Sequence, residues 1–252
     1  MALSIGEIKE LYQTTTESEL SAFALRFAED ERSGVRKLVE SAEKRLKAIE
    51  KEKERIWQLQ KYEREYSLYQ HICGIDEVGR GPLAGPVVAG AVILPKNCDI
   101  LYINDSKQLS EKKREELYDI IMEKAVACGI GYASPERIDE INILQATYEA
   151  MRQAISNLSV CPDLLLNDAV NIPHVSIRQV PIIKGDAKSL SIGAASIIAK
   201  VTRDRLMVDY GKIFPEYDFA GNKGYGSAVH IEALKKYGPT PIHRKSFIKN
   251  FL

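Results

Sequence analysis

The chain has 252 residues, 45% of them hydrophobic and 28% charged, and its 35 basic and 35 acidic residues leave no net charge. This composition is typical of a protein with a real core, and the length allows one large domain or one domain with an appendage. No apolar run approaches the ~20 residues needed to span a bilayer, and the N-terminus lacks the features of a secretory signal, so we expect a cytoplasmic protein without a membrane partner. The cysteines are widely spaced without a C-x-x-C pair, which indicates reduced, mostly buried thiols.

The charges are unevenly distributed along the chain. Residues 1–70 contain 13 basic and 14 acidic residues, residues 71–178 contain 10 and 15, and residues 179–252 contain 12 and 6. An acidic middle suits metal ligands, and a basic C-terminal third suits a polyanion. A random surface can produce such an asymmetry too, so the pattern needs support from specific residues.

The first 70 residues are rich in helix-forming and charged side chains, and no proline occurs before Pro82. Ser33 is suited to be the N-cap of a helix. The residues after it trace a heptad seam with one lysine in it: Val35, Val39, Ala42, Leu46, Ile49, Lys53 and Ile56. We expect residues 1–70 to form a helical extension that packs on itself or on the body, with recruitment of a protein partner or contact with nucleic acid as alternative roles.

Two adjacent carboxylates, Asp76 and Glu77, follow a short apolar run that predicts a buried strand. Neighbouring strand residues point to opposite faces, so both acids can serve one site only if the strand ends there and the chain turns. Glycines and prolines between positions 79 and 86 supply that turn, and Arg80 among them is a fork suited to phosphate. Paired acids beside a glycine-flanked arginine indicate a divalent metal acting on a phosphate group; the alternative is a surface turn with solvated charges.

Strands and helices alternate through the rest of the chain. We expect strands over residues 86–94, 129–133, 164–168 and 175–183, and helices over about 110–127, from 134, over 142–158 and over 189–210. Asp168 ends an apolar strand as Asp76 does. Ser106 and Lys107 lie in a polar loop and either hold a phosphate or form an ordinary turn. The segment around Lys188 is not a P-loop, because Ala187 precedes the lysine.

Five motifs of this chain resemble, in order, those of bacterial ribonuclease HII. They are Asp-Glu-Val-Gly-Arg-Gly-Pro-Leu-Ala-Gly-Pro at 76–86, Asp-Ser-Lys-x-Leu at 105–109, the strand 164–168, Lys-Gly-Asp-x-Lys-Ser at 184–189 and Gly-Tyr-Gly at 224–226. The resemblance covers about residues 71–250. Asn167 departs from the family pattern, in which the residue before the strand-ending aspartate is apolar.

The resemblance implies an α/β fold: a ribonuclease H-like mixed β-sheet flanked by helices, with a helical N-terminal extension and a helical C-terminal region. Residues 71–252 would form the catalytic domain, with a substrate-binding region over about 210–252. The catalytic and metal-binding residues that it implies are four acids: Asp76, Glu77, Asp168 and Asp186. Such a set prefers Mg²⁺ or Mn²⁺, and two ions about 4 Å apart would activate a water and stabilise the leaving 3′ oxygen.

The substrates implied are RNA/DNA hybrids and DNA duplexes that contain ribonucleotides, as in ribonucleotide excision repair. The enzyme would cut on the 5′ side of a single ribonucleotide and leave 5′-phosphate and 3′-hydroxyl ends. The substrate-binding residues implied are Gly79, Arg80, Gly81, Ser106, Lys107, Lys188 and Tyr225. Among them the backbone of residues 79–81 would read the 2′-hydroxyl, and Tyr225 would stack on the following nucleotide.

The sequence leaves three alternative functions to compare with ribonuclease HII. Ribonuclease HIII lacks the arginine that this chain has as Arg80 and carries a β-rich N-terminal domain. An inactive nucleic-acid-binding or scaffold protein would have little reason to keep four mutually repelling acids, and a phosphodiesterase for small substrates would not need the basic C-terminal third. We expect a monomer, a structural or phosphate-binding role for His230 and His243, and a solvated helix end at Asp204.

Overall fold

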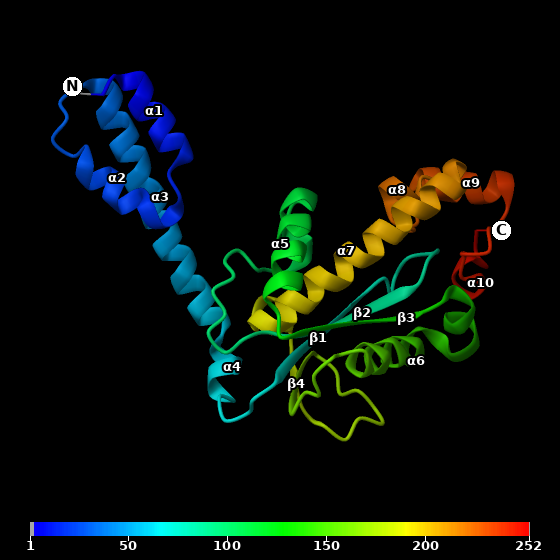
Figure 1. Ribbon diagram of the computed structural model, residues 1–252. Helices are drawn as coiled ribbons and strands as arrows, with labels where there is room; N and C mark the ends of the chain where they lie inside the picture. The colour runs from blue at the N-terminus through cyan, green and yellow to red at the C-terminus, as the bar shows by residue number, and fades with distance from the viewer. Residues whose placement is uncertain (1–2, 252) are drawn as a thin grey trace. The chain divides into compact units, whose positions relative to one another are not determined.

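The computed structural model describes residues 3–251 and divides the chain into two compact units, Met1–Gln58 and Leu59–Leu252 (Figure 1). No helix among the described residues is both long and apolar enough to cross a bilayer.

The first unit is built from helices. They are α1 (Ile5–Thr14), the 3₁₀ turn η1 (Glu17–Glu19), α2 (Leu20–Arg26) and α3 (Ser33–Leu59), whose last residue lies in the second unit. Tyr12 of α1 packs against Phe23 of α2, with ring centroids 5.4 Å apart, and its hydroxyl hydrogen-bonds Ser41 of α3 at 2.7 Å. The heptad seam of α3 is buried or half-buried except at Lys53, which is exposed. A polar residue in the seam is tolerated because the short helices cover only part of α3.

The second unit contains one five-stranded sheet. Its strands are β1 (Ile72–Val78), β2 (Val87–Ile93), β3 (Ala127–Ala133), β4 (Leu164–Asp168) and β5 (Arg178–Ile182). The order across the sheet is β3-β2-β1-β4-β5, with β1–β2 and β2–β3 antiparallel and β1–β4 and β4–β5 parallel. The expected mixed sheet is therefore present, and β1 lies at its centre.

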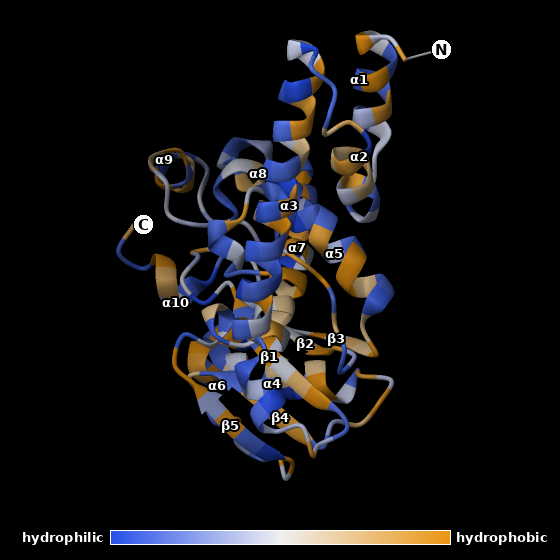
Figure 2. Ribbon diagram, turned by 90° about the vertical axis from the view of Figure 1, so that its left-hand side faces the viewer, coloured by the Kyte–Doolittle hydropathy of each residue, from blue (hydrophilic) through white to orange (hydrophobic). Residues whose placement is uncertain are grey.

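Two long helices cover the faces of this sheet (Figure 1). The helices of the unit are α4 (Lys61–Glu65), α5 (Glu111–Lys124), α6 (Pro135–Ser156), α7 (Leu190–Ile213), α8 (Phe219–Asn222), α9 (Ala228–Tyr237) and α10 (Lys245–Ile248), with 3₁₀ turns η2 (Ser106–Gln108), η3 (Gly185–Ala187) and η4 (Pro215–Tyr217). Apolar residues of β1, β2 and β4 form one core cluster with α6, and Figure 2 shows apolar stretches along the strands. The opposite face receives α7.

Small residues allow α7 to approach the sheet closely. A Cβ at Gly74 of β1 would lie 2.1 Å from the backbone carbon of Ser191, and one at Gly90 of β2 would lie 2.5 Å from the carbonyl oxygen of Ala195. Both distances are far below van der Waals contact, so only glycine fits. The N-terminal half of α7 is thereby fixed against the strand that carries the paired acids.

Several expected boundaries were wrong. The fifth strand begins at Arg178 instead of 175, and Ala127 begins β3 instead of ending the preceding helix. The two helices expected to meet at Asn142 are confirmed: α6 is interrupted there, φ is 67°, and the side-chain oxygen accepts hydrogen bonds from the first turn of the second helix. Cys73 and Cys98 are buried as expected, whereas Cys161 is exposed.

Candidate metal centre and nucleic-acid interface

Register places Asp76 and Asp168 side by side. Strands β1 and β4 run parallel with Ile75 opposite Asn167, so each strand continues into its aspartate at the same edge of the sheet. Asp76 is on the face covered by α7, two residues after Gly74, and is only 7% exposed. Asp168 is the last residue of β4 as expected, whereas the expected strand end at Asp76 and Glu77 was wrong, because β1 continues to Val78 in its pairing with β2.

Each of three acids is held by a donor from the protein. The Glu77 backbone N–H donates to Asp76 Oδ1 at 2.8 Å, and the Gly185 N–H donates to Asp168 Oδ1 at 2.7 Å. Glu77 Oε1 accepts from Arg80 Nη1 at 3.2 Å. The bond from Gly185 joins the loop that carries Asp186 to the end of β4.

The carboxylates perturb one another. Burial raises the pKa of Asp76 well above its ordinary value, and the charges of Glu77 and Asp168 raise it further. Burial also raises the pKa of Glu77, against the opposing effect of Arg80, and that of Asp186, which Asp105 and Asp168 raise as well. These mutual effects show that the structure brings the acids of three separate segments into one electrostatic cluster.

The donor set suits a hard divalent cation, because it consists of carboxylate oxygens. Buried like charges also leave a cost that a cation would relieve. No three acidic, histidine or cysteine side chains in residues 3–251 form a ready-made metal cluster. In this arrangement Glu77 accepts from Arg80, and Asp168 accepts from the Gly185 N–H.

Asn167 faces away from this cluster. Its side-chain nitrogen donates to Val170 O at 3.1 Å and to Gln179 Oε1 at 2.7 Å, and the residue is fully buried. Asn167 therefore holds the segment after β4, and Asp168 is the acceptor at the acidic edge. A buried amide with partners of its own replaces the apolar residue of the family pattern.

The loop between β1 and β2 is held by two fully buried arginines, Arg203 and Arg244. Arg203 donates to Pro86 O at 2.9 Å and Ala84 O at 3.1 Å. A Cβ at Gly79, where φ is +90°, would lie 2.3 Å from Arg203 Nε. The guanidinium is thus packed against the loop backbone itself.

Arg244 holds the other carbonyls of the same loop. It donates to Gly79 O at 2.5 Å, Arg80 O at 2.9 Å and Gly85 O at 2.9 Å. Burial lowers the pKa of Arg203 to about 10 and that of Arg244 to about 9, so both stay charged at neutral pH. Sequence reasoning missed both, because it took the charged end of α7 as solvated and gave Arg244 no role.

Tyr225 lies against this loop. Its ring carbon Cε1 is 3.7 Å from the Cβ position of Gly81, and the residue is 47% exposed. The Gly224 carbonyl accepts hydrogen bonds from the backbone of Leu83 and Ala84 at 2.8 and 3.3 Å, which fixes the tyrosine's segment to the loop. An exposed ring on a fixed backbone can stack on a base or sugar at little entropic cost.

Ser106 and Lys107, which lie in one motif, differ in their exposure to solvent. Ser106 is buried, and its hydroxyl pairs with Ser196 Oγ at 2.9 Å; the Ser196 hydroxyl also hydrogen-bonds Asp76 and so lowers its pKa. Lys107 is exposed and its charge reaches both Glu77 and Asp186. Ser106 thus supports Asp76 through Ser196, while the side chain of Lys107 is exposed to solvent.

Asp204 was expected at a solvated helix end, and this was wrong. The residue is 7% exposed and forms an ion pair with Lys200 at 2.7 Å, because α5 covers that part of α7.

The two C-terminal histidines have a structural role. Thr240 N–H donates to His243 Nδ1 at 2.9 Å, so the neutral ring carries its proton on Nε2 and donates to His230 Nε2, also at 2.9 Å. His230 then donates from Nδ1 to Tyr225 O at 2.8 Å. This chain of bonds fixes the backbone of the exposed tyrosine.

Comparisons with known proteins agree with this arrangement. Residues 73–250 match the family model described as Ribonuclease HII, and residues 4–67 match the Ribonuclease HII N-terminal domain. The chain is 65% identical to the ribonuclease HII of Lachnoclostridium phytofermentans, covering 99% of this chain and 98% of that protein. It is 51% identical to that of Clostridioides difficile, covering 99% and 98%. These matches favour ribonuclease HII over the HIII alternative.

Solved structures give the same result for the fold. The ribonuclease H2 of Pyrococcus horikoshii superposes with a TM-score of 0.59 at 29% identity, over 70% of this chain and 93% of that one. The Archaeoglobus fulgidus ribonuclease HII, solved in a complex with PCNA, gives 0.59 at 27% identity, over 71% and 96%. The expected ribonuclease H-like fold is confirmed, and the chain belongs to the ribonuclease HII family of metal-dependent endonucleases.

Proposed function

We propose that this protein hydrolyses the RNA strand of RNA/DNA hybrids and cuts on the 5′ side of single ribonucleotides in duplex DNA, leaving 5′-phosphate and 3′-hydroxyl ends. The observation that carries the proposal is the electrostatic cluster of acids at one edge of the sheet, beside a loop whose carbonyls accept hydrogen bonds from buried arginines. The cluster supplies the hydrolytic centre, and the loop presents its backbone to the sugar beside it.

In this proposal two Mg²⁺ or Mn²⁺ ions are held by the four acids, Asp76, Glu77, Asp168 and Asp186. When bound, such ions supply activation of the attacking water and stabilisation of the leaving 3′ oxygen. The protein's own part is to hold the acids at one edge of the sheet. Glu77 would give up its ion pair with Arg80 to bind a metal ion, which frees the guanidinium for a substrate phosphate.

Selectivity for RNA is assigned to the segment Gly79-Arg80-Gly81. Because Arg244 occupies the carbonyl oxygens of Gly79 and Arg80, the N–H groups of the segment are the backbone atoms that would read a 2′-hydroxyl. Tyr225 would stack on the next nucleotide, where a deoxyribose packs closely. Lys107 and Lys188, both exposed, would hold backbone phosphates, and Ser106 would keep the Lys107 loop in place.

The two parts of the chain would have separate roles. We infer that residues 71–252 contain the whole catalytic and substrate-binding apparatus, with residues 1–70 as an extension that binds a protein partner. All the residues proposed to bind metal or substrate lie within residues 71–252. We propose action as a monomer in the cytoplasm, on nucleic acid and without a membrane partner.

Replacing Asp76 tests the chemistry directly. The Asp76→Asn variant should lose detectable cleavage of a hybrid, because it removes one charged oxygen ligand, while it still binds the hybrid in a gel-shift assay. Asp99→Asn, at an exposed acid paired with Lys124, is the matched control and should cleave at the wild-type rate. Retained turnover in Asp76→Asn would contradict the four-acid assignment.

A further inference from the structure

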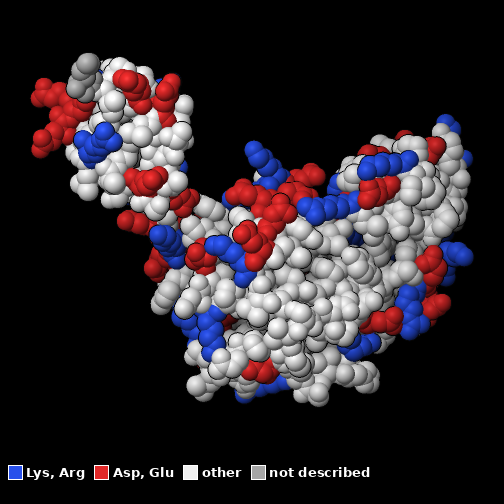
Figure 3. All heavy atoms as spheres, in the orientation of Figure 1, with Lys and Arg blue, Asp and Glu red and all other residues white. Residues whose placement is uncertain are grey.

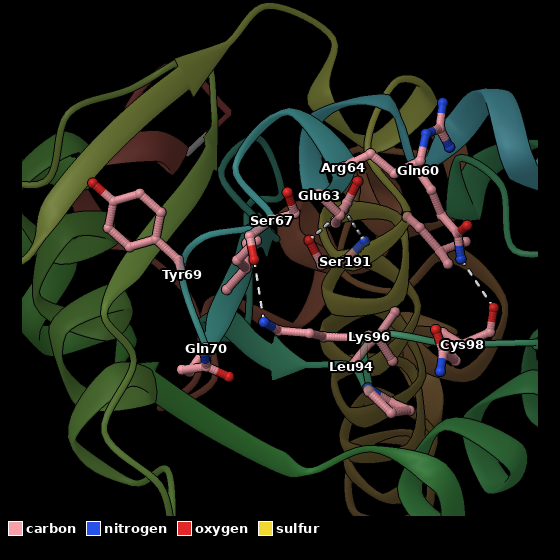
Figure 4. A pocket seen from close by; sticks show the side chains of 14 residues that line it. Gln60, Glu63, Arg64, Ser67, Tyr69, Gln70, Leu94, Lys96, Cys98 and Ser191 are labelled. Carbon is pink, nitrogen blue, oxygen red and sulfur yellow. Dashed lines mark hydrogen bonds between the residues drawn. The ribbon is translucent and has the colours of Figure 1, made fainter.

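Glu63 of α4 is a carboxylate that no catalytic motif includes, and it bonds the first turn of α7. Its Oε1 accepts from Ser189 Oγ at 2.6 Å. It also accepts from Ser191 N–H at 2.9 Å and from Ser191 Oγ at 2.7 Å (Figure 4). The residue lies in the wall of a cavity of about 280 Å³ whose lining residues all belong to the second unit. One oxygen of α4 thus receives three hydrogen bonds at the start of α7.

These bonds organise the N-cap of α7. The Ser189 hydroxyl donates to Glu63 and accepts from the Ile192 N–H at 3.3 Å, so the carboxylate fixes the hydroxyl in the orientation that capping needs. A negative charge also suits the N-terminus of a 24-residue helix. The first turn of α7 is therefore held from one side by Glu63 and from the other by the close contact with Gly74.

A continuous route of hydrogen bonds leads from Glu63 to the acidic cluster. Ser189, whose hydroxyl bonds Glu63, donates its backbone N–H to Gly185 O at 2.8 Å. Gly185 in turn donates its N–H to Asp168 Oδ1 at 2.7 Å. Asp186 lies within the short turn that this route closes, so the positions of two acids depend on the cap.

Stability alone does not account for this carboxylate. Its second oxygen, Oε2, is buried without a hydrogen-bond partner among residues 3–251. Leaving a buried acceptor unsatisfied costs free energy. The side chain keeps this arrangement while its other oxygen bonds the start of α7, which is better explained by a need to fix that turn.

We propose that Glu63 is a positioning residue of the metal centre: through Ser189 and Gly185 it holds the turn of Asp186 and the carboxylate of Asp168 in the geometry that binds divalent ions. This inference rests on the proposed four-acid site. It gives α4, which directly follows the N-terminal unit, a role in the active site of the second unit.

The test is an electron paramagnetic resonance titration of free Mn²⁺ against the full chain. Glu63→Ala should bind Mn²⁺ about tenfold more weakly than wild type, the effect typical of losing a residue that orients metal ligands. Glu63→Gln keeps an oxygen acceptor for the serines and should fall between the two. Gln60→Ala is the matched control: Gln60 lies in the same cavity wall and donates to Cys98 O at 2.9 Å, but it does not bond α7. It should bind Mn²⁺ as wild type does.

A second readout follows the loop without metal. Amide hydrogen exchange of residues 185–191 should accelerate in Glu63→Ala and stay unchanged in Gln60→Ala. Equal Mn²⁺ affinity in wild type and Glu63→Ala, or equal weakening by Gln60→Ala, would overturn the positioning role. If Glu63→Ala does not fold, Glu63→Gln decides, and wild-type affinity in it overturns the proposal. Failure of the wild-type protein itself to bind Mn²⁺ would instead contradict the proposed metal site.

Discussion

At the scale of single residues, the alternation of side chains along β1 points Asp76 and Glu77 to opposite faces of the sheet. Asp76 shares the α7 face with Gly74, whereas Glu77 belongs to the face of Ile75, which packs toward α6. Glu77 nevertheless interacts with Asp168, because it lies one residue from the strand end and is drawn to Arg80. β1 continues only to Val78, so both acids lie close enough to its end to interact with Asp168.

Tyr225 is the residue whose proposed role has the clearest single-residue test. Tyr225→Ala should reduce the cleavage rate at a lone ribonucleotide in DNA by about 10- to 100-fold, because a stacked ring contributes about 1–3 kcal/mol. Tyr225→Phe keeps the ring and should stay close to wild type. Single-turnover cleavage of a labelled duplex gives both rates, and unchanged activity in Tyr225→Ala would exclude the stacking role.

At the scale of elements, the loop between β1 and β2 is unusual in being braced from inside. Arg203 reaches it from α7, and Arg244 reaches it from the segment before α10. Among residues 3–251 neither guanidinium has a carboxylate hydrogen-bond partner; both donate to backbone carbonyls. The loop's shape therefore depends on segments more than 100 residues away, although its own sequence carries the turn.

Replacing Arg244 should uncouple the loop from the C-terminal segment. Arg244→Lys loses the planar fork and leaves two or more buried carbonyls without a donor, so we expect the free energy of unfolding to fall by at least about 2 kcal/mol. Cleavage at a lone ribonucleotide should weaken as well. Urea unfolding and a cleavage assay measure the two effects. Lys245→Ala, at the exposed neighbouring position, should change neither; an equally stable and active Arg244→Lys variant would show that the loop needs no brace.

The sequence predicts most elements but not the contacts between them. The strands of Asp76 and Asp168 and the helix expected from about residue 110 were recognisable because apolar runs and capping residues are local signals. The burial of Arg203 and the bond from Glu63 to Ser189 depend on chain segments far apart in sequence. No local pattern distinguishes a buried arginine from a solvated one, so these residues could be found only in the structure.

At the scale of the whole molecule, the charge distribution limits where a nucleic acid can lie. Figure 3 shows acidic side chains gathered over α5, to which Glu111, Glu115, Glu116 and Asp119 belong. Arg205 of α7 is paired there with Glu115, so its charge is neutralised. The backbone of a duplex is expected to avoid this surface and to follow the exposed lysines near the acidic cluster.

The histidine pair makes the stability of the second unit depend on pH. Burial and the neighbouring His230 lower the pKa of His243 to about 4, while its unfolded value is about 6.5. The folded state therefore binds fewer protons between these values, so stability is full above pH 6.5 and falls as the pH drops toward 4. The loss would reach about 3 kcal/mol for this group. Urea unfolding across this range should show the slope, and His243→Gln should reduce it; an unchanged slope would contradict the neutral pair.

Cleavage of a labelled DNA duplex with one ribonucleotide, incubated with Mg²⁺, Mn²⁺ or EDTA, tests the proposed hydrolysis itself. We expect a single cut on the 5′ side of the ribonucleotide that disappears in EDTA. Salt-sensitive binding of the same duplex without any cut, in either metal, would contradict it and would indicate a nucleic-acid-binding protein without catalysis.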